Sequence, residues 1–418
     1  MGYYLSAEQL KQLRTYKYSG LDKSLISRYV LNPFWTWFVT LWPASVAPNT
    51  ITFLGLCIVF LNFAILLWYD PLYRSEAGGA SGPPNWVYFT WAAGLFWYQA
   101  FDAIDGKQAR RTGMAGPLGE MFDHGCDAIN TTLEVLLCAQ ALNLGRNWWT
   151  VASELATLAN FYLTTWEEFH TGTLFLGYFS GPVEGILMIV GIYIITGLYG
   201  PSFWDTPLLT FLSLDKHPLA TLLIPNKPLN ESFMIFGALA LLYNIVGAYW
   251  DVLLARRSRS QPILPPLLGL IPFLVTCALQ LAWLWADEAL LLQSGRFLPF
   301  VCAWGLQFAH QVGRMILAHV TKNAFPFWDW MWPWTLAMAV DANAPFLFGR
   351  SPLIQSTPLR ADLIVLLTLL VSLIYYVRFC TLVIWDITDY LGIACFSVQK
   401  KDSEGTWVRA QMANGKKE

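Results

Sequence analysis

Four aspartates in the chain have the spacing of a metal site shared between two helices. Asp102 and Asp105 are three residues apart and Asp123 and Asp127 are four apart, so each pair shares one face of a helix. Apolar segments flank both pairs, and carboxylates at the ends of membrane helices are costly to keep there. Four acids with this periodicity therefore indicate a functional site rather than solvated acids at the edge of a loop.

These acids suit metal-assisted chemistry at phosphorus. Two such helices placed face to face would gather four carboxylates around one cavity, and protonation or cations must relieve their repulsion. Two divalent cations would balance the charge, and all-oxygen ligands favour hard ions such as Mg²⁺ or Mn²⁺. Two ions can stabilise a phosphoryl transfer, one on each side of the displacement. Lys107, Arg110 and Arg111 add positive charge that suits a diphosphate.

Small residues are interleaved with the acids. Gly106 and Ala109 fall on the helical face of Asp102, and Gly119 lies one turn before Asp123. Residues without bulky side chains let another group approach the backbone closely. The pattern therefore predicts a ligand that lies directly against these two helices.

The stretch from Asp102 to Asp127 resembles the signature of the CDP-alcohol phosphotransferases. It reads Asp-x-x-Asp-Gly-x-x-Ala-Arg, then eight residues, then Gly-x-x-x-Asp-x-x-x-Asp, and every fixed position matches. The stretches that resemble the eukaryotic choline/ethanolamine phosphotransferase branch are residues 16–24, 48–52, 166–173 and 313–322. With them, the resemblance covers most of the chain.

The resemblance implies a reaction and a set of contacts. The reaction is transfer of phosphocholine or phosphoethanolamine from CDP-choline or CDP-ethanolamine to diacylglycerol, with release of CMP. The four aspartates are expected to hold two Mg²⁺ ions, for which Mn²⁺ can substitute. Asn49, which could equally cap the first span, is implied to face the active site. The residues expected to contact the CDP-alcohol are Asn49, Gly106, Lys107, Ala109, Arg110 and Gly119.

Two groups compete for the role of general base. The family assigns this role to the last aspartate, here Asp127, but a carboxylate bound to two metal ions is a weak base. His170 follows Glu167 by three residues, and a carboxylate one helical turn away can orient an imidazole and raise its basicity. An interfacial pair at a helix end would explain the same two residues without catalysis.

The composition indicates an all-α, polytopic membrane protein. The chain has 418 residues, of which 56% are hydrophobic and 13% are charged. A net charge of −2 suggests no nucleic-acid partner, and seven cysteines without paired spacing indicate neither a disulfide framework nor a zinc site. Long apolar runs predict about ten spans. They are expected near residues 50–70, 85–110, 118–143, 149–170, 180–200, 231–255, 263–287, 296–320, 332–347 and 361–386.

The distribution of Lys and Arg predicts the orientation. Both are more frequent in the segments on the side of the N-terminus, which the positive-inside rule places in the cytosol. The aspartates then lie at the cytosolic headgroup level, where a nucleotide arrives from the cytosol and a lipid from the bilayer. The resemblance implies the endoplasmic reticulum or the Golgi as the membrane.

Four regions are expected along the chain. Interfacial amphipathic helices are expected over residues 1–46, because tryptophans follow a partly helical apolar pattern there. The resemblance implies a six-helix catalytic core over 47–255 and a four-helix extension over 256–395 that provides the surface of a homodimer. Residues 396–418 are expected to form a solvated cytosolic tail.

One basic residue of the eighth predicted span, Arg314, has no role in the proposed transfer reaction. Arg314 follows His310 by four residues, and an isolated Arg inside a span would be costly. It can extend its side chain to the cytosolic interface, or it can contact a lipid headgroup or a phosphate.

Two other functions fit part of the pattern. A CDP-diacylglycerol enzyme would join phosphatidyl to a soluble alcohol such as inositol, but the predicted length of ten spans and the stretch around His170 argue against it. A cation or proton transporter would place acids near the middle of the bilayer, whereas these acids gather at one interface. Within the favoured reaction, both choline and ethanolamine are compatible with the sequence.

Overall fold

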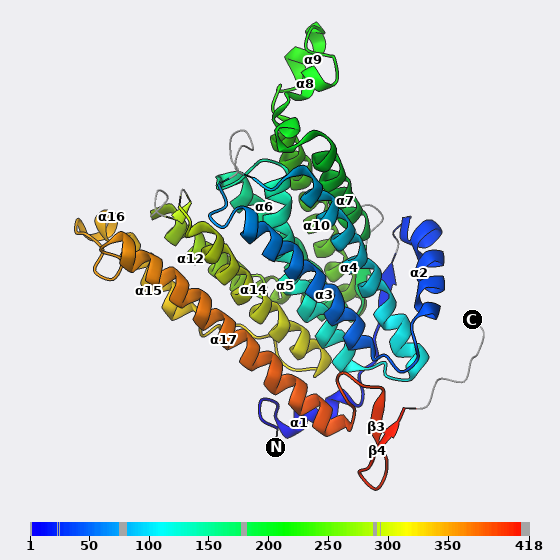
Figure 1. The fold of residues 1–418 in the computed structure, drawn as a ribbon. Helices are drawn as coiled ribbons and strands as arrows, with labels where there is room; N and C mark the ends of the chain where they lie inside the picture. The colour runs from blue at the N-terminus through cyan, green and yellow to red at the C-terminus, as the bar shows by residue number, and fades with distance from the viewer. Residues whose placement is uncertain are drawn as a thin grey trace.

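The computed structural model describes residues 2–22, 24, 26–74, 82–176, 182–286, 291–292 and 294–410. These residues are mostly helical, with two short two-stranded sheets. Long helices run side by side as one bundle, and the N-terminus lies at its lower end beside the last sheet (Figure 1). The all-α class expected from composition is therefore confirmed in its coarse form.

The bundle consists of helices that are long enough to cross most or all of a bilayer. They are α3 (Pro48–Tyr69), α4 (Asn85–Thr112), α5 (Pro117–Ala141), α6 (Trp148–Thr171), α7 (Pro182–Tyr199), α10 (Leu229–Ser258), α12 (Ile271–Ala286), α14 (Phe297–Val320) and α17 (Pro358–Leu391).

Four segments in the described part of the chain are both long and apolar enough to span a membrane: α3, α10, Pro265–Ala286 and α17. Helices α4, α5 and α6 are long too, but α4 and α5 carry the charged residues of the motif and α6 carries Glu167 and Glu168 beside it. Their polar composition is thus a consequence of the site that they hold.

Shorter elements connect and cap the bundle. They are α1 (Ala7–Leu13), β1 (Gly20–Asp22), η1 (Ser27–Leu31), α2 (Asn32–Phe38), η2 (Val39–Leu41), β2 (Leu174–Leu176), η3 (Pro201–Asp205), α8 (Leu208–Phe211), α9 (Pro218–Leu223), α11 (Pro265–Leu268), α15 (Trp332–Ala342), α16 (Ala344–Phe348), β3 (Gln399–Lys401) and β4 (Trp407–Arg409). Between α7 and α10, the helices α8 and α9 project beyond the bundle (Figure 1).

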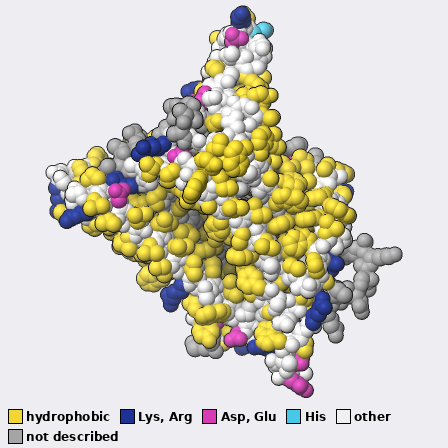
Figure 2. Space-filling model, viewed as in Figure 1, with side chains coloured by type: hydrophobic (Ala, Val, Ile, Leu, Met, Phe, Trp, Pro, Cys, Tyr) yellow, Lys and Arg dark blue, Asp and Glu magenta, His cyan; other side chains and the backbone are white. Residues whose placement is uncertain are grey.

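Hydrophobic side chains cover the outside of the bundle. Figure 2 shows them over most of the face in view, while charged side chains gather towards the ends. The interior is apolar as well, with Trp91, Trp166, Trp283 and Trp304 among the largest fully buried side chains. Apolar groups both inside and outside are typical of helices packed within a bilayer.

Buried polar pairs join neighbouring helices inside this apolar bundle. Thr132 of α5 donates a hydrogen bond to the carboxylate of Glu154 on α6 at 2.7 Å. Tyr193 of α7 donates a hydrogen bond to Glu134 of α5 at 2.8 Å. Since unpaired polar groups are expensive in hydrocarbon, such pairs fix which helices pack together.

A tight turn brings the two acid-bearing helices to one end of the bundle. Helix α4 ends at Gly113, whose φ of 68° is left-handed and suits glycine. Helix α5 begins shortly afterwards with Pro117 in its first turn, a position where proline costs no hydrogen bond. The motif therefore folds into a hairpin, and its acids lie about two to three helical turns away from the connection on both helices.

The N-terminal region is tied to the bundle at two places. Strand β1 pairs in parallel with β2, the strand that follows α6, with Gly20 opposite Leu174. The backbone N–H groups of Tyr3, Tyr4 and Leu5 donate hydrogen bonds to the carboxylate of Asp386 on α17, at 2.6, 2.7 and 2.7 Å. Helices were expected in this region, and α1 and α2 are present, but the strand was not expected.

The C-terminal region up to Ala410 is a packed hairpin. Strands β3 and β4 pair in an antiparallel manner, with Lys400 opposite Val408. Val398 and Ala410 are buried in one cluster with Ala47 and Met114, next to the starts of α3 and of the α4–α5 turn. Residues 411–418, the rest of the expected tail, lie outside the described residues.

Candidate functional site

The four aspartates converge at the cytosolic end predicted for α4 and α5. One carboxylate oxygen from each of Asp102, Asp123 and Asp127 lies within 4.8 Å of the others. Thr52 of α3 donates a hydrogen bond to Asp105, which is buried. Tyr98, four residues before Asp102 on α4, donates a hydrogen bond to Asp127 at 2.5 Å.

The arrangement of these oxygens fits a hard divalent cation. Among the described residues, Oδ1 of Asp102 and Oδ1 of Asp123 are buried and have no hydrogen-bond partner. Carboxylates at such close range repel each other, and burial strengthens that repulsion. A divalent cation would satisfy the unpartnered oxygens and offset the charge, and its preference for oxygen ligands matches this donor set.

These acids lie at one end of a cavity of ≈ 1440 Å³. Its wall includes all four aspartates and every residue predicted to contact the CDP-alcohol. Those contacts are Asn49, Gly106, Lys107, Ala109, Arg110 and Gly119. Residues of α3, α4 and α5 that the motif and the resemblance single out therefore share one space in the fold.

The glycines of the motif leave room in this cavity. A Cβ atom built at Gly119 would meet no other atom within 4 Å, and one at Gly106 would meet only Nη1 of Arg110, at 3.7 Å. Helix packing therefore does not require glycine at either position. The space next to both backbones is open, which leaves room for the ligand predicted there.

The basic residues of the motif have different surroundings. Lys107 lines the cavity, and its Nζ donates hydrogen bonds to the side chains of Asn32 and Thr36 on α2, at 2.7 and 3.2 Å. Arg110 lines the cavity and is exposed. Arg111 instead donates hydrogen bonds to backbone carbonyls of the N-terminal region at 2.9 and 2.8 Å, so it holds that region in place.

Glu167 and His170 lie in different environments. Glu167 is buried and lines the cavity, as does Asp251 of α10. The ring of His170 packs against Trp166 and Phe169, with centroids 5.3 and 5.1 Å apart, and does not line the cavity. Its Nε2 atom has no hydrogen-bond partner in the described part of the chain. The predicted contact of Glu167 with His170 is not formed, and their catalytic roles stay predictions.

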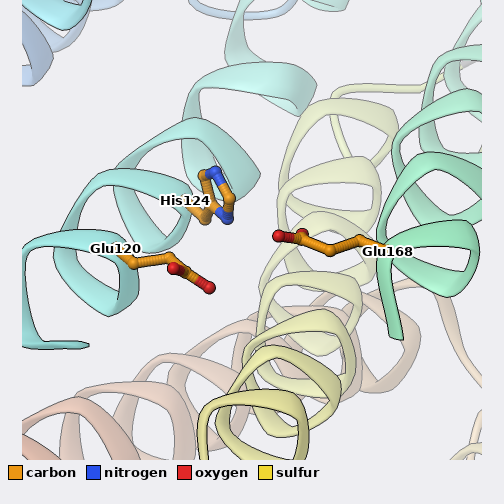
Figure 3. A group of neighbouring side chains, drawn as sticks. All are labelled: Glu120, His124 and Glu168. Carbon is orange, nitrogen blue, oxygen red and sulfur yellow. The ribbon is translucent and has the colours of Figure 1, made fainter. Parts of the chain in front are cut away.

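A second group of ionisable side chains adjoins the aspartates. Glu120 and His124 of α5 point towards Glu168 of α6 (Figure 3). One ligand atom from each lies within 4.8 Å of the others, and both carboxylate oxygens of Glu120 are buried without a partner among the described residues. Glu120 and His124 also line the cavity.

Sequence reasoning missed this group, although its spacing was visible. Glu120 and His124 are four residues apart, so they share a helical face next to that of Asp123 and Asp127. Their partner Glu168 comes from α6, and only the packing of α5 against α6 brings it close. Tyr98 was visible in the same way, four residues before Asp102.

The N-terminal region contributes Tyr18 to the mouth of the cavity. Loss of solvation chiefly, and then the negative charges of Glu168 and Asp123, raise the pKa of its phenol to about 12. Tyr18 therefore remains a neutral hydrogen-bond donor at physiological pH. A water-soluble ligand that enters the cavity would meet this hydroxyl group.

The cavity continues away from the acids between α5, α6, α7 and α10. Its wall runs along α6 from Glu167 back to Trp149, a distance of about 27 Å at the helical rise. At the far end the wall is formed by Leu142, Phe233 and Met234. One cavity thus joins a polar end that holds the acids to an apolar end near the starts of α6 and α10, towards the opposite end of the bundle.

Known proteins resemble the chain over nearly its whole length. The sequence model of CDP-alcohol phosphatidyltransferases matches residues 45–212. An uncharacterized class-I member of this family from Schizosaccharomyces pombe is 38% identical, covering 95% of this chain and 98% of its own. Cholinephosphotransferase 1 of Saccharomyces cerevisiae is 34% identical, covering 96% and 99%. Choline/ethanolaminephosphotransferase 1 of Arabidopsis thaliana is 35% identical, covering 96% and 100%.

The matched region contains the whole aspartate motif and the helices that carry it. Identity at this level over almost the full length of both chains extends beyond the motif to the later helices. Together with the cavity that these residues line, the comparisons show that the chain belongs to the CDP-alcohol phosphatidyltransferase family.

Proposed function

We propose that this protein transfers phosphocholine or phosphoethanolamine from a CDP-alcohol to diacylglycerol, giving a phospholipid and CMP. The observation that carries the proposal is the single cavity that joins the four aspartates to an apolar interior. The polar end suits a nucleotide diphosphate, and the apolar end suits acyl chains. The names of the relatives from yeast and Arabidopsis support the same reaction.

Acidic side chains in the cavity support a cationic alcohol. Glu167 and Asp251 both line it on the side of α6 and α10. Carboxylates attract the ammonium group of choline or ethanolamine, whereas inositol is uncharged. Their presence therefore favours this reaction over phosphatidyl transfer to inositol.

We infer that Asp102, Asp105, Asp123 and Asp127 hold two Mg²⁺ ions, which Mn²⁺ can replace. When bound, such ions lower the negative charge on the diphosphate and favour departure of CMP. Thr52 and Tyr98 hold Asp105 and Asp127 in place through their hydroxyl groups. Lys107 and Arg110 direct positive charge at the diphosphate, and Asn49, Gly106, Ala109 and Gly119 complete the nucleotide end.

A base must take the proton of the diacylglycerol hydroxyl group. Asp127 and the pair of Glu167 and His170 are the bases proposed from the sequence. The fold adds His124, which lines the cavity next to Asp123, whereas His170 does not line it. Position in the cavity therefore favours His124 over His170 for direct proton transfer.

The membrane placement is part of the proposal. We infer about ten spans, in agreement with the apolar runs, and an active site that faces the cytosol from the endoplasmic reticulum or Golgi membrane. Residues 47–255 form the catalytic core and 256–395 the extension, through which two copies associate as a homodimer. Microscopy of a fluorescently tagged chain checks the membrane, and the mass of the detergent-solubilised particle checks the dimer. A particle with the mass of one chain would contradict the homodimer.

The decisive experiment measures CMP release by the purified full chain. CDP-choline or CDP-ethanolamine should give CMP only when diacylglycerol is present. CMP release that instead needs CDP-diacylglycerol and inositol would establish the alternative reaction, phosphatidyl transfer to inositol. The absence of CMP from both reactions, together with ion flux in proteoliposomes, would establish a transporter.

A further inference from the structure

An arginine on the outer face of α17 has no counter-charge among the residues that the structure describes. Arg378 is exposed, and its side chain forms no ion pair or hydrogen bond with the described residues. It lies about 30 Å along the helix from Pro358 and about 12 Å before Asp386, where the N-terminal segment is bound. An Arg on the lipid-facing side of a spanning helix is costly unless an anion meets it.

A second arginine and two phenols surround the same place. Arg314 of α14 donates a hydrogen bond to the backbone carbonyl of Trp328. Burial raises the pKa of Tyr4, while the charges of Arg314 and Arg378 oppose this rise, so both guanidinium groups lie near that phenol. Tyr375, one turn before Arg378 and Phe379, packs its ring 4.2 Å from that of His310.

Two acids of the described residues lie close to this group, and both are already satisfied. Asp386 accepts hydrogen bonds from the backbone N–H groups of Tyr3, Tyr4 and Leu5. Asp329 is 4% exposed and accepts a hydrogen bond from the backbone N–H of Met331 at 2.8 Å. Its other oxygen lies 3.3 Å from Nδ1 of His310. The carboxylate therefore points inward, and positive charge remains on the outer side of α14 and α17.

The surroundings place this positive charge at the level of lipid headgroups. The N-terminal segment and α1 lie beside the lower end of α17 (Figure 1). Exposed aromatic side chains, which favour the membrane–water interface, occur in the neighbouring segments. They are Tyr3, Tyr4, Trp328, Trp330 and Trp385.

We propose that Arg314, Arg378, Tyr4 and Tyr375 bind the phosphate of an anionic phospholipid in the cytosolic leaflet. Guanidinium groups donate paired hydrogen bonds to phosphate oxygens, and phenols add single donors. Excess positive charge favours a lipid with net negative charge over a zwitterionic one. None of these four residues lines the catalytic cavity, so the site is separate from it.

Occupation of this site would link three distant parts of the chain. Tyr4 belongs to the N-terminal segment, Arg314 to α14 and Arg378 to α17. A phosphate bound to all three would hold the extension and the N-terminal segment together. Bound anionic lipid should therefore raise the thermal stability of the protein. It should also stay bound when the protein is released from the membrane.

The test uses the full chain in phosphatidylcholine nanodiscs, titrated with phosphatidic acid. Native mass spectrometry after gentle release counts bound phosphatidic acid, and thermal unfolding reports its effect. Arg378→Gln should weaken binding by at least about fivefold, the effect of one basic residue at a membrane surface. Arg378→Lys should retain part of the affinity, because it keeps the charge without the paired donors.

Arg360→Gln is the matched control, since Arg360 lies at the opposite end of α17 and its side chain donates a hydrogen bond to Ser356 at 2.9 Å. It should bind phosphatidic acid as the wild type does. The proposal would be overturned if Arg378→Gln bound phosphatidic acid as tightly as the wild type does. It would also be overturned if the wild type retained phosphatidylcholine as well as phosphatidic acid. Competition by inorganic phosphate at millimolar concentration would show a phosphate site and not a lipid site. Arg378 is exposed, so its loss should not prevent folding, and binding is scored independently of CMP release.

Discussion

The hydroxyl groups of Tyr98 and Thr52 are part of the site, because they position the acids that they contact. A neutral hydroxyl that donates to a carboxylate fixes its orientation without removing its charge. Tyr98 does this for Asp127, and Thr52 for Asp105. One oxygen each of Asp102, Asp123 and Asp127 lies within 4.8 Å of the others, and a fixed orientation of Asp127 keeps its oxygen in place for a metal ion.

Replacing Tyr98 by Phe should weaken the metal site while leaving the fold intact. Loss of an outer partner of a ligand typically costs about 10–100-fold in metal affinity. The Mg²⁺ concentration that half-activates CMP release should rise accordingly. Tyr88→Phe is the control, because Tyr88 lies on the same helix and its buried hydroxyl has no partner among the described residues. An equal Mg²⁺ requirement in both variants would contradict the role of Tyr98.

Replacing Gly119 by Ala should separate stability from binding. A Cβ atom at this position meets nothing, so the helix should gain up to about 1 kcal/mol from the better helix former. The same methyl group enters the space predicted for the CDP-alcohol, so its KM should rise. Gly191→Ala, on α7 outside the cavity and equally unobstructed, should stabilise without a change in KM. Unchanged KM in Gly119→Ala would remove this helix face from the nucleotide site.

Replacing His124 and His170 by Ala in separate variants should identify the general base. A positioned base contributes about 10²–10⁴-fold, so His124→Ala should lower turnover by that order while CDP-choline still binds. If His170 acts as predicted from the sequence, His170→Ala should show the same loss. Near-normal turnover in either variant excludes that histidine, and near-normal turnover in both leaves Asp127 as the base.

At the scale of elements, helix faces and the packing between helices decide which side chains meet at the site. The sequence predicted which residues share a helical face, because spacing along one helix fixes that directly. Spacing could not predict that α6 supplies Glu168 to a group with Glu120 and His124, because that depends on how α5 packs against α6. The strand β1 was also missed, since three residues paired with a distant segment leave no periodic pattern.

The contact of the N-terminal segment with α17 should be stabilising. Three backbone N–H groups donate to Asp386, and hydrogen bonds to charged groups contribute about 1.5–3 kcal/mol each at most. Asp386→Ala should lower the thermal midpoint and expose the N-terminal segment to protease. Asp389→Ala is the control, because its contact with Lys401 is exposed and long, at 3.8 Å. Equal protease sensitivity of both variants would refute the contact.

For the whole molecule, an apolar exterior with charged ends implies that the bundle crosses the membrane and that the acidic end of the cavity opens to one side of it. The sequence predicted this coarse picture well, because hydropathy is a property of composition. The sequence could not predict the shape of the cavity, since that space lies between six long helices whose packing no single segment encodes.

A cysteine probe tests the orientation of the whole protein. Ala115 lies exposed in the turn between α4 and α5, so Ala115→Cys should not disturb the fold. In sealed microsomes a membrane-impermeant maleimide should label it from the cytosolic side. Leu222→Cys, at the exposed α9 beyond the other end of the bundle, should be labelled only after permeabilisation. The reverse pattern would place the active site in the lumen.

The bond between Asp386 and the N-terminal segment also has a consequence for biosynthesis. Its partners are separated by 381–383 residues, so it cannot form until the ribosome has made almost the whole chain. During synthesis the N-terminal segment remains without its acceptor while the earlier helices assemble. Closure of this contact therefore marks completion of the protein. A chain that terminates before α17 should display an open N-terminal segment that degradation enzymes can recognise.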